Sequence, residues 1–145
     1  MKMFAKLGAI AALGLGLAFT SQAIAGADTA PQTVNAAAIS VTPSTGLSDG
    51  AAVAVAGTGL QAGVVYHLGE CVQVSATSLA CDPTTNTDVT ADASGNAGSP
   101  ITVHRTFTGV THEGATHATD CTVDNCVVAF FSDTFDGGLV PISFN

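Results

Sequence analysis

Larger apolar residues occupy every second position in several short stretches of this chain. Val53 and Val55 alternate with alanines, and Val64, Tyr66 and Leu68 also lie two residues apart. An alternation with period two places these side chains on one face of a β-strand. Beyond the first 25 residues no stretch shows the helical period, and the helix-favouring residues Glu and Lys are scarce. The pattern therefore predicts strands rather than helices.

Clusters of Gly, Asp, Asn and Ser separate the predicted strands at intervals of roughly 8–12 residues. Asp49-Gly50 is a strong hairpin signal. The predicted strands cover residues 39–42, 51–56, 64–74, 79–81, 89–91, 101–106, 126–131 and 140–144, with a long loop or irregular ribbon over 108–120 and a turn over 132–138. Many short strands joined by such turns indicate an all-β, antiparallel β-sandwich.

The segment 63–81 is the predicted hairpin on which the functional interpretation depends. Gly69 interrupts its alternation, which indicates a β-bulge or a close approach of another segment to the backbone. The Ser- and Thr-containing segment 75–78 has the composition of a turn. A disulfide between Cys71 and Cys81 would close this hairpin beside a sheet.

The first 25 residues have the layout of a secretory signal peptide. Lys2 and Lys6 precede an apolar run over 7–20, and small residues at Ala23 and Ala25 suit a cleavage site after residue 25. The run is shorter than the about 20 residues that a transmembrane helix needs. We expect a flexible leader over 26–38, with a weaker cleavage site after Ala36, and one domain over 39–145. The protein is expected to be secreted and extracellular.

The four cysteines, at positions 71, 81, 121 and 126, are an even number in a chain expected to be secreted. They indicate disulfides and allow three connectivities, of which the sequential pairing is the most local. A zinc site is disfavoured, because the spacings of ten and five residues do not match C-x-x-C and the compartment is oxidising.

Charge excludes several classes of partner. Without the signal peptide, Arg105 is the single Lys or Arg against 11 acidic residues. Such a surface repels nucleic-acid phosphate and anionic membranes. We expect a monomer that contacts neither a membrane nor nucleic acid directly.

Motifs for catalysis are missing from the sequence. It contains neither G-x-S-x-G nor H-E-x-x-H, and two disulfides would leave no thiol nucleophile. His112, Glu113 and His117, with His67 and Glu70 elsewhere, offer donors for copper or zinc. Their place in a predicted loop favours solvent-exposed histidines instead. We therefore expect neither an enzyme nor a metal site.

Several motifs together resemble the neocarzinostatin family, the secreted apoproteins of enediyne antibiotics. They are VTPSTGLSDG over 41–50, VAGTGLQAG over 55–63, VTADASG over 89–95, the spacing from Cys71 to Cys81, DC-x4-C over 120–126 and ISFN over 142–145. The resemblance implies an immunoglobulin-like seven-stranded sandwich with an additional two-stranded ribbon. It also implies sequentially paired disulfides and a cleft that holds a non-covalent enediyne chromophore. The chromophore, not the protein, would damage DNA.

The resemblance further implies a set of ligand-binding positions. They are Gly69, Cys71, Gln73, Leu79, Cys81, Asn86, Val110, His112, Gly114, Val127, Phe131 and Ser132. Aromatic positions of the family fall here on residues 73, 86, 110 and 112, and a polar one falls on 127, so known chromophores should bind poorly. Either Phe130 or Phe131 faces the cleft. The predicted function is a carrier of a small hydrophobic ligand; the alternative is an immunoglobulin-like structural or adhesive module that has lost this site.

Overall fold

The computed structural model describes residues 37–145. The expected signal peptide, both cleavage sites and nearly all of the leader lie outside the described residues. Between residues 37 and 145, no helix is long and apolar enough to cross a membrane.

The described chain forms ten β-strands. They are β1 (Ala38–Thr42), β2 (Ala51–Thr58), β3 (Val65–Ser75), β4 (Ser78–Cys81), β5 (Thr87–Thr90), β6 (Ala97–Val103), β7 (Thr106–Thr111), β8 (Thr116–Asp120), β9 (Cys126–Ser132) and β10 (Gly137–Pro141).

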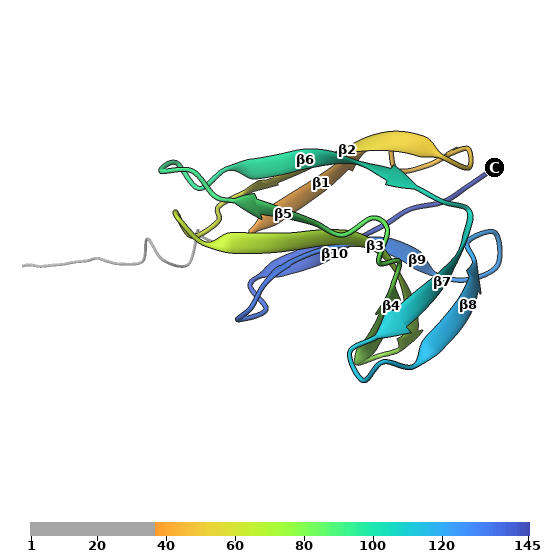
Figure 1. The fold of residues 1–145 in the computed structure, drawn as a ribbon. Coiled ribbons are helices and arrows are strands. Elements are labelled where there is room, and N and C mark those ends of the chain that lie inside the picture. The colour runs from red at the N-terminus through yellow and green to blue at the C-terminus, as the bar shows by residue number, and fades with distance from the viewer. Residues whose placement is uncertain (1–36) are drawn as a thin grey trace, which may run out of the picture. The chain divides into compact units, whose positions relative to one another are not determined.

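These strands make two antiparallel sheets, as the alternation predicts. One sheet has the order β1-β2-β6, and the other has the order β10-β9-β3-β4-β7-β8, with β5 paired to β3. Three strands thus face β10, β9, β3 and β5, which accounts for the seven-stranded sandwich. The ribbon is the β7–β8 hairpin, which joins β4 through the pairs Ala80–Thr111 and Cys81–Val110. In Figure 1, β4, β7 and β8 extend to one side of the two layers.

The core lies between the layers. Val53 and Val55 of β2 are 1% and 2% exposed, and they pack with Tyr66 and Leu68 of β3. Phe130 of β9 is fully buried and lies against Tyr66, with ring centroids 5.4 Å apart. Alternate positions of the strands therefore supply the core, which confirms the period-two reading.

Strand β3 serves the sandwich and the hairpin at once. Its residues 65–68 pair with β5, and its residues 71–75 pair with β4. Its residues 66–72 pair with β9. The register is continuous at Gly69, which faces Ala129, so the predicted bulge there is wrong. The register shift lies instead between Gln73 and Ser75, next to the turn.

Several predicted boundaries also need correction. The irregular ribbon over 108–120 is a regular hairpin, β7–β8, and Arg105 lies in the turn between β6 and β7 rather than on a strand. The last strand is Gly137–Pro141 rather than 140–144. After β10 the ladder with β9 ends. Phe144 instead forms an isolated parallel bridge with Leu47, in the segment between β1 and β2.

Both disulfides form sequentially. Cys71 is bonded to Cys81, and Cys121 to Cys126. This confirms the most local of the three connectivities, and it leaves no free cysteine among the described residues.

A candidate ligand-binding cleft

Strand β9 is apolar on both of its faces. Cys126, Val128 and Phe130 point into the sandwich core, whereas Val127 and Phe131 belong to a second apolar cluster. This explains why the segment is an almost unbroken apolar run. Of the two adjacent phenylalanines, Phe130 is therefore in the core, and Phe131 is the one that faces the cleft.

The second cluster covers the outer face of the large sheet. Its buried members are Cys71, Val127 and Ala129, and the partly buried Leu79, Cys81, Phe131 and Leu139 pack around them. The outer face of an antiparallel sheet normally alternates to polar residues and meets solvent. An apolar cluster on that face is therefore a candidate contact surface.

The surface is recessed where its smallest residues, Gly69 and Ala129, lie. Gly69 of β3 lies directly opposite Ala129 of β9, between the larger pairs His67–Phe131 and Cys71–Val127. A Cβ atom on Gly69 would lie 2.8 Å from Asn86 Oδ1. Of the two readings of Gly69, the close approach of another segment is thus the one that the structure shows.

The resulting cleft has two adjoining compartments. The first, of about 470 Å³, lies over Gly69, Cys71, Ala129 and Phe131. The second, of about 540 Å³, extends toward the β7–β8 hairpin. Both are lined by Leu79, Cys81, Asn86, His112 and Phe135. Each volume lies within the range of small-molecule sites, roughly 300–1,000 Å³.

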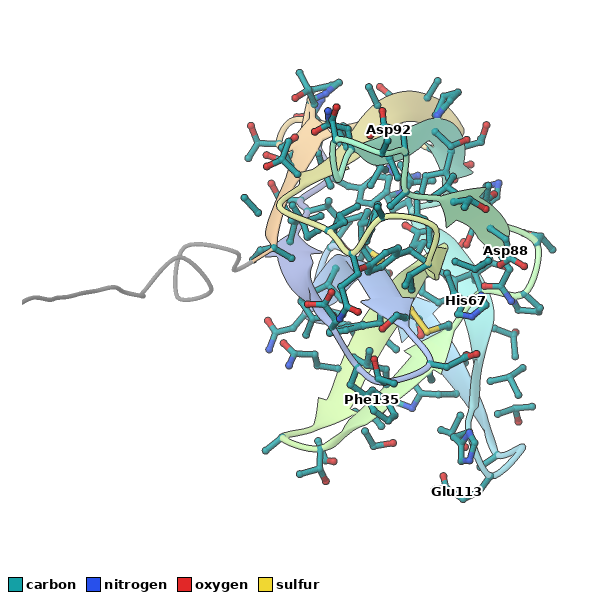
Figure 2. The ribbon with its side chains drawn as sticks, turned by 90° about the vertical axis from the view of Figure 1, so that its left-hand side faces the viewer. His67, Asp88, Asp92, Glu113 and Phe135 are labelled. Carbon is teal, nitrogen blue, oxygen red and sulfur yellow. A yellow bond between two sulfur atoms is a disulfide. The ribbon has the colours of Figure 1, made fainter. Side chains whose placement is uncertain are left out.

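Phe135 is the most unusual residue of the cleft. It lies in the β9–β10 turn with a φ of 63°, a conformation that bulky residues rarely adopt, and it is 84% exposed. Its ring lies edge-to-face with Phe131, with centroids 6.5 Å apart. Figure 2 shows Phe135 on the β9–β10 turn and Glu113 on the β7–β8 turn, and both residues line the second compartment. Such strain at an exposed aromatic is typical of a binding site.

Hydrogen bonds hold the turn that carries Phe135. Ser132 N donates to Asp136 O at 2.9 Å, and Phe135 N donates to Ser132 O at 2.9 Å. Ser132 Oγ accepts from Thr134 N at 3.3 Å and from Asp136 N at 3.2 Å. The ring therefore stands on a fixed turn rather than on a loose loop.

His67 links the rim of the cleft to two carboxylates. Its Nδ1 lies 2.8 Å from Asp88 Oδ1 on β5, and its Nε2 lies 3.0 Å from Asp133 Oδ1 on the β9–β10 turn. His67 and Asp88 are seen side by side in Figure 2. The hydrogen bond with Asp88 raises the pKa of His67, and the bond with Asp133 adds to this against the opposing effect of partial burial. A protonated ring would thus tie Asp133 to the sheet.

The structure brings most of the expected ligand-binding positions together. Gly69, Cys71, Leu79, Cys81, Asn86, His112, Phe131 and Ser132 line the first compartment, and Val110 joins the second. Three positions lie elsewhere. Gln73 faces a side pocket of about 230 Å³ beyond Leu79. Val127 belongs to the same outer-face cluster but lines a different pocket, with Cys126 and Pro141. Gly114 is at the β7–β8 turn with a φ of 90°.

Sequence reasoning missed five residues that line the first compartment: His67, Leu68, Ala129, Asp133 and Phe135. It also missed Thr77, Ser78, Thr111 and Glu113 of the second compartment. A signal for one of them was present, because a phenylalanine inside a turn of Asp, Thr and Gly residues has no core to enter. His112 and His117 are not part of any three-residue metal-capable cluster in the described segment.

The chain is similar to known proteins in sequence and in fold. The chain is 39% identical to macromomycin from Streptomyces macromomyceticus over 145 residues, covering 99% of this chain and 95% of that protein. It is 36% identical to the antitumor antibiotic C-1027 apoprotein from Streptomyces globisporus over 140 residues, covering 96% of this chain and 92% of that protein. The solved structure of macromomycin superposes with a TM-score of 0.72 at 41% identity, over 76% of this chain and all of that one.

A model of the neocarzinostatin family matches residues 39–144, which is almost the whole of the described sandwich. Together with these relatives, this match shows that the chain belongs to the neocarzinostatin family.

Proposed function

We propose that this protein is a non-enzymatic carrier that holds a small, largely apolar molecule in the cleft without a covalent bond. The observation that supports this best is the second apolar cluster on the outer face of the large sheet. Its floor is hollowed at Gly69 and Ala129, and Phe135 stands beside it on a fixed turn. A flat structural face would need neither the hollow nor the strained aromatic.

The nature of the ligand is suggested by the lining and by the relatives. One relative is described as the apoprotein of an antitumor antibiotic, and the family resemblance implies an enediyne chromophore. The floor offers apolar contact, whereas Asn86 and His112 add polar groups where the family has aromatic rings. We infer a polycyclic or enediyne-type ligand whose shape or polarity differs from those of the known chromophores.

The protein itself is proposed to be secreted and not to contact DNA directly. Its acidic composition, with Arg105 as the single Lys or Arg among positions 37–145, opposes contact with phosphate. A released ligand would act on DNA in its place. The dry floor would protect a labile molecule by excluding water and thiols from it.

The test is native mass spectrometry of protein secreted by its own host, together with titration of the purified protein with the neutral dye Nile red. We expect a small-molecule adduct and saturable dye binding. Ala129→Phe should fill the hollow and weaken dye binding by at least about tenfold, which corresponds to 1.4 kcal/mol. Ala54→Phe, on the exposed face of β2, is the matched control and should leave binding unchanged.

A wild-type protein with neither an adduct nor saturable dye binding would overturn the carrier proposal. Equal loss in Ala129→Phe and Ala54→Phe would show that the dye binds outside the cleft and would overturn the assignment of the site.

A further inference from the structure

A cluster of polar side chains lies on the face of strand β3 that is opposite the cleft. Glu70 on β3 has a fully buried side chain, and Asp82 after β4 is 5% exposed in its side chain. His104, which follows β6, is 35% exposed in its side chain. One potential ligand atom from each of the three residues lies within 4.8 Å of the other two.

From this convergence we propose that Glu70, Asp82 and His104 form a binding site for a divalent transition-metal ion, with Zn²⁺ as the best-suited probe. Imidazole combined with carboxylate oxygen is a donor set that Zn²⁺ accepts. Three protein ligands also leave a coordination position for water.

The distances suit such an ion. His104 Nδ1 lies 3.1 Å from Asp82 Oδ2 and 3.9 Å from Glu70 Oε2. Zn²⁺ holds O and N ligands at about 2.0–2.2 Å in a tetrahedron, so its ligands lie roughly 3.3–3.6 Å apart. Both distances from His104 Nδ1 are therefore close to this range, and the Glu70 and Asp82 oxygens lie within 4.8 Å of each other.

An independent observation also points to a missing partner. Glu70 Oε1 is buried and has no hydrogen-bond partner, whereas Oε2 accepts from His104 N at 2.7 Å. A buried carboxyl oxygen without a partner is costly and rare in native proteins. A cation bound by the Glu70 carboxyl group would offset this cost.

The site is prepared by its surroundings. The Cys71–Cys81 disulfide joins the residue after Glu70 to the residue before Asp82, and Asp82 N donates to Glu70 O at 2.8 Å. Thr84 donates to Asp82 Oδ1 from its N at 2.9 Å and from its Oγ1 at 2.8 Å, so Oδ2, which is hydrogen-bonded to His104 Nδ1 at 3.1 Å, is the oxygen that faces the site. Outer partners of this kind orient ligands and raise metal affinity.

Local charge also favours a cation. Asp49 and Asp82 both act on Glu70 with negative charge. Arg105 N donates to Asp49 Oδ1 at 2.9 Å, and its side chain is exposed. The partly exposed ring of His104 provides access from solvent.

The test is calorimetric titration of the oxidised, secreted protein with Zn²⁺ at neutral pH, after treatment with a chelator. We expect one ion per chain with a micromolar Kd. Glu70→Gln and Asp82→Asn keep the side-chain size and should each weaken binding by at least about tenfold. His112→Gln and His117→Gln are the controls and should bind as the wild type does. Ca²⁺ should bind less tightly than Zn²⁺, because the donor set includes imidazole.

Crystals soaked in Zn²⁺ provide a second readout that needs no variant. An anomalous peak between Glu70, Asp82 and His104 is expected. A wild-type Kd in the millimolar range, a peak at His112 or His117 instead, or unchanged affinity in Glu70→Gln would overturn the proposal. In that case Glu70 is simply a neutral buried acid. None of these outcomes bears on the cleft.

Discussion

Tyr66 Oη donates a hydrogen bond to Asp136 Oδ2 at 2.5 Å and accepts one from Gln61 N at 3.0 Å. Tyr66 is fully buried in the core, whereas Asp136 belongs to the turn that carries Phe135. Burial, followed by the bond with Asp136, raises the pKa of Tyr66. One hydroxyl group thus fastens the edge of the cleft to the centre of the sandwich.

Tyr66→Phe should keep the ring against Phe130 and remove this attachment. Because Gln61 N and Asp136 lose their partner, we expect the free energy of unfolding in urea to fall by about 1–2 kcal/mol. Hydrogen exchange of residues 133–136 should accelerate more than exchange in β2. Exchange that rises equally in both places would mean that the hydroxyl group has no special effect on the turn.

Phe135→Ala should reduce ligand binding without loss of stability. The ring is 84% exposed, and its φ of 63° is unfavourable for any side chain, so its removal leaves the core untouched. Loss of an aromatic contact of about 0.5–1.5 kcal/mol should weaken Nile red binding up to about tenfold. Val123→Ala, at an equally exposed residue of the Cys121–Cys126 loop, is the control. Unchanged binding in Phe135→Ala would remove Phe135 from the site.

Glu70 should make the metal-free protein less stable as pH rises. Burial raises its pKa to about 8 from 4.5, so the folded state holds more protons than the unfolded state between those two values. Stability is therefore greatest below about pH 4.5 and falls toward pH 8, by up to about 1.4 kcal/mol per pH unit. Glu70→Gln should lack this dependence in urea titrations with a chelator. Parallel pH profiles of the two proteins would contradict the assignment.

His67 should titrate above its ordinary value of 6.5, with Asp88 as the main cause. Because the pKa is raised in the folded state, the stabilisation is complete below pH 6.5 and is lost as pH passes the folded value. The ring is half exposed, so the gain should stay below about 1 kcal/mol. NMR titration should show a larger downward shift of the pKa in Asp88→Asn than in Asp133→Asn. The reverse order would assign the dominant interaction to the turn.

The alternation of residues carries much information about the sandwich, and less about its cleft. Val53 and Val55 reveal their strand because larger apolar side chains alternate with small alanines. The sequence of β9 does not show which residues face the core, because Val127 and Phe131 are as apolar as Val128 and Phe130. An unbroken apolar run has no period from which a direction can be read.

The polar site behind the cleft could not be predicted from the sequence for a different reason. Glu70 and His104 are 34 positions apart, and they meet because the segment after β6 passes Glu70, where His104 N donates to Glu70 Oε2. The pairing of β3 with β4 brings Asp82 to the same place. His112 and His117, which are close in the sequence, do not converge on a shared group of donors. Contact in space followed strand topology rather than sequence spacing.

Strands β3 and β9 direct their even-numbered residues inward and their odd-numbered residues toward the cleft. Substitutions at positions 129 and 131 can thus reshape the receiving surface while residues 66, 68 and 130 continue to hold the layers together. The pleat separates the selection of cargo from the maintenance of the fold. A scaffold of this kind can be adapted to a new guest by changing one side of two strands, which makes it a practical starting point for engineered delivery of unstable molecules.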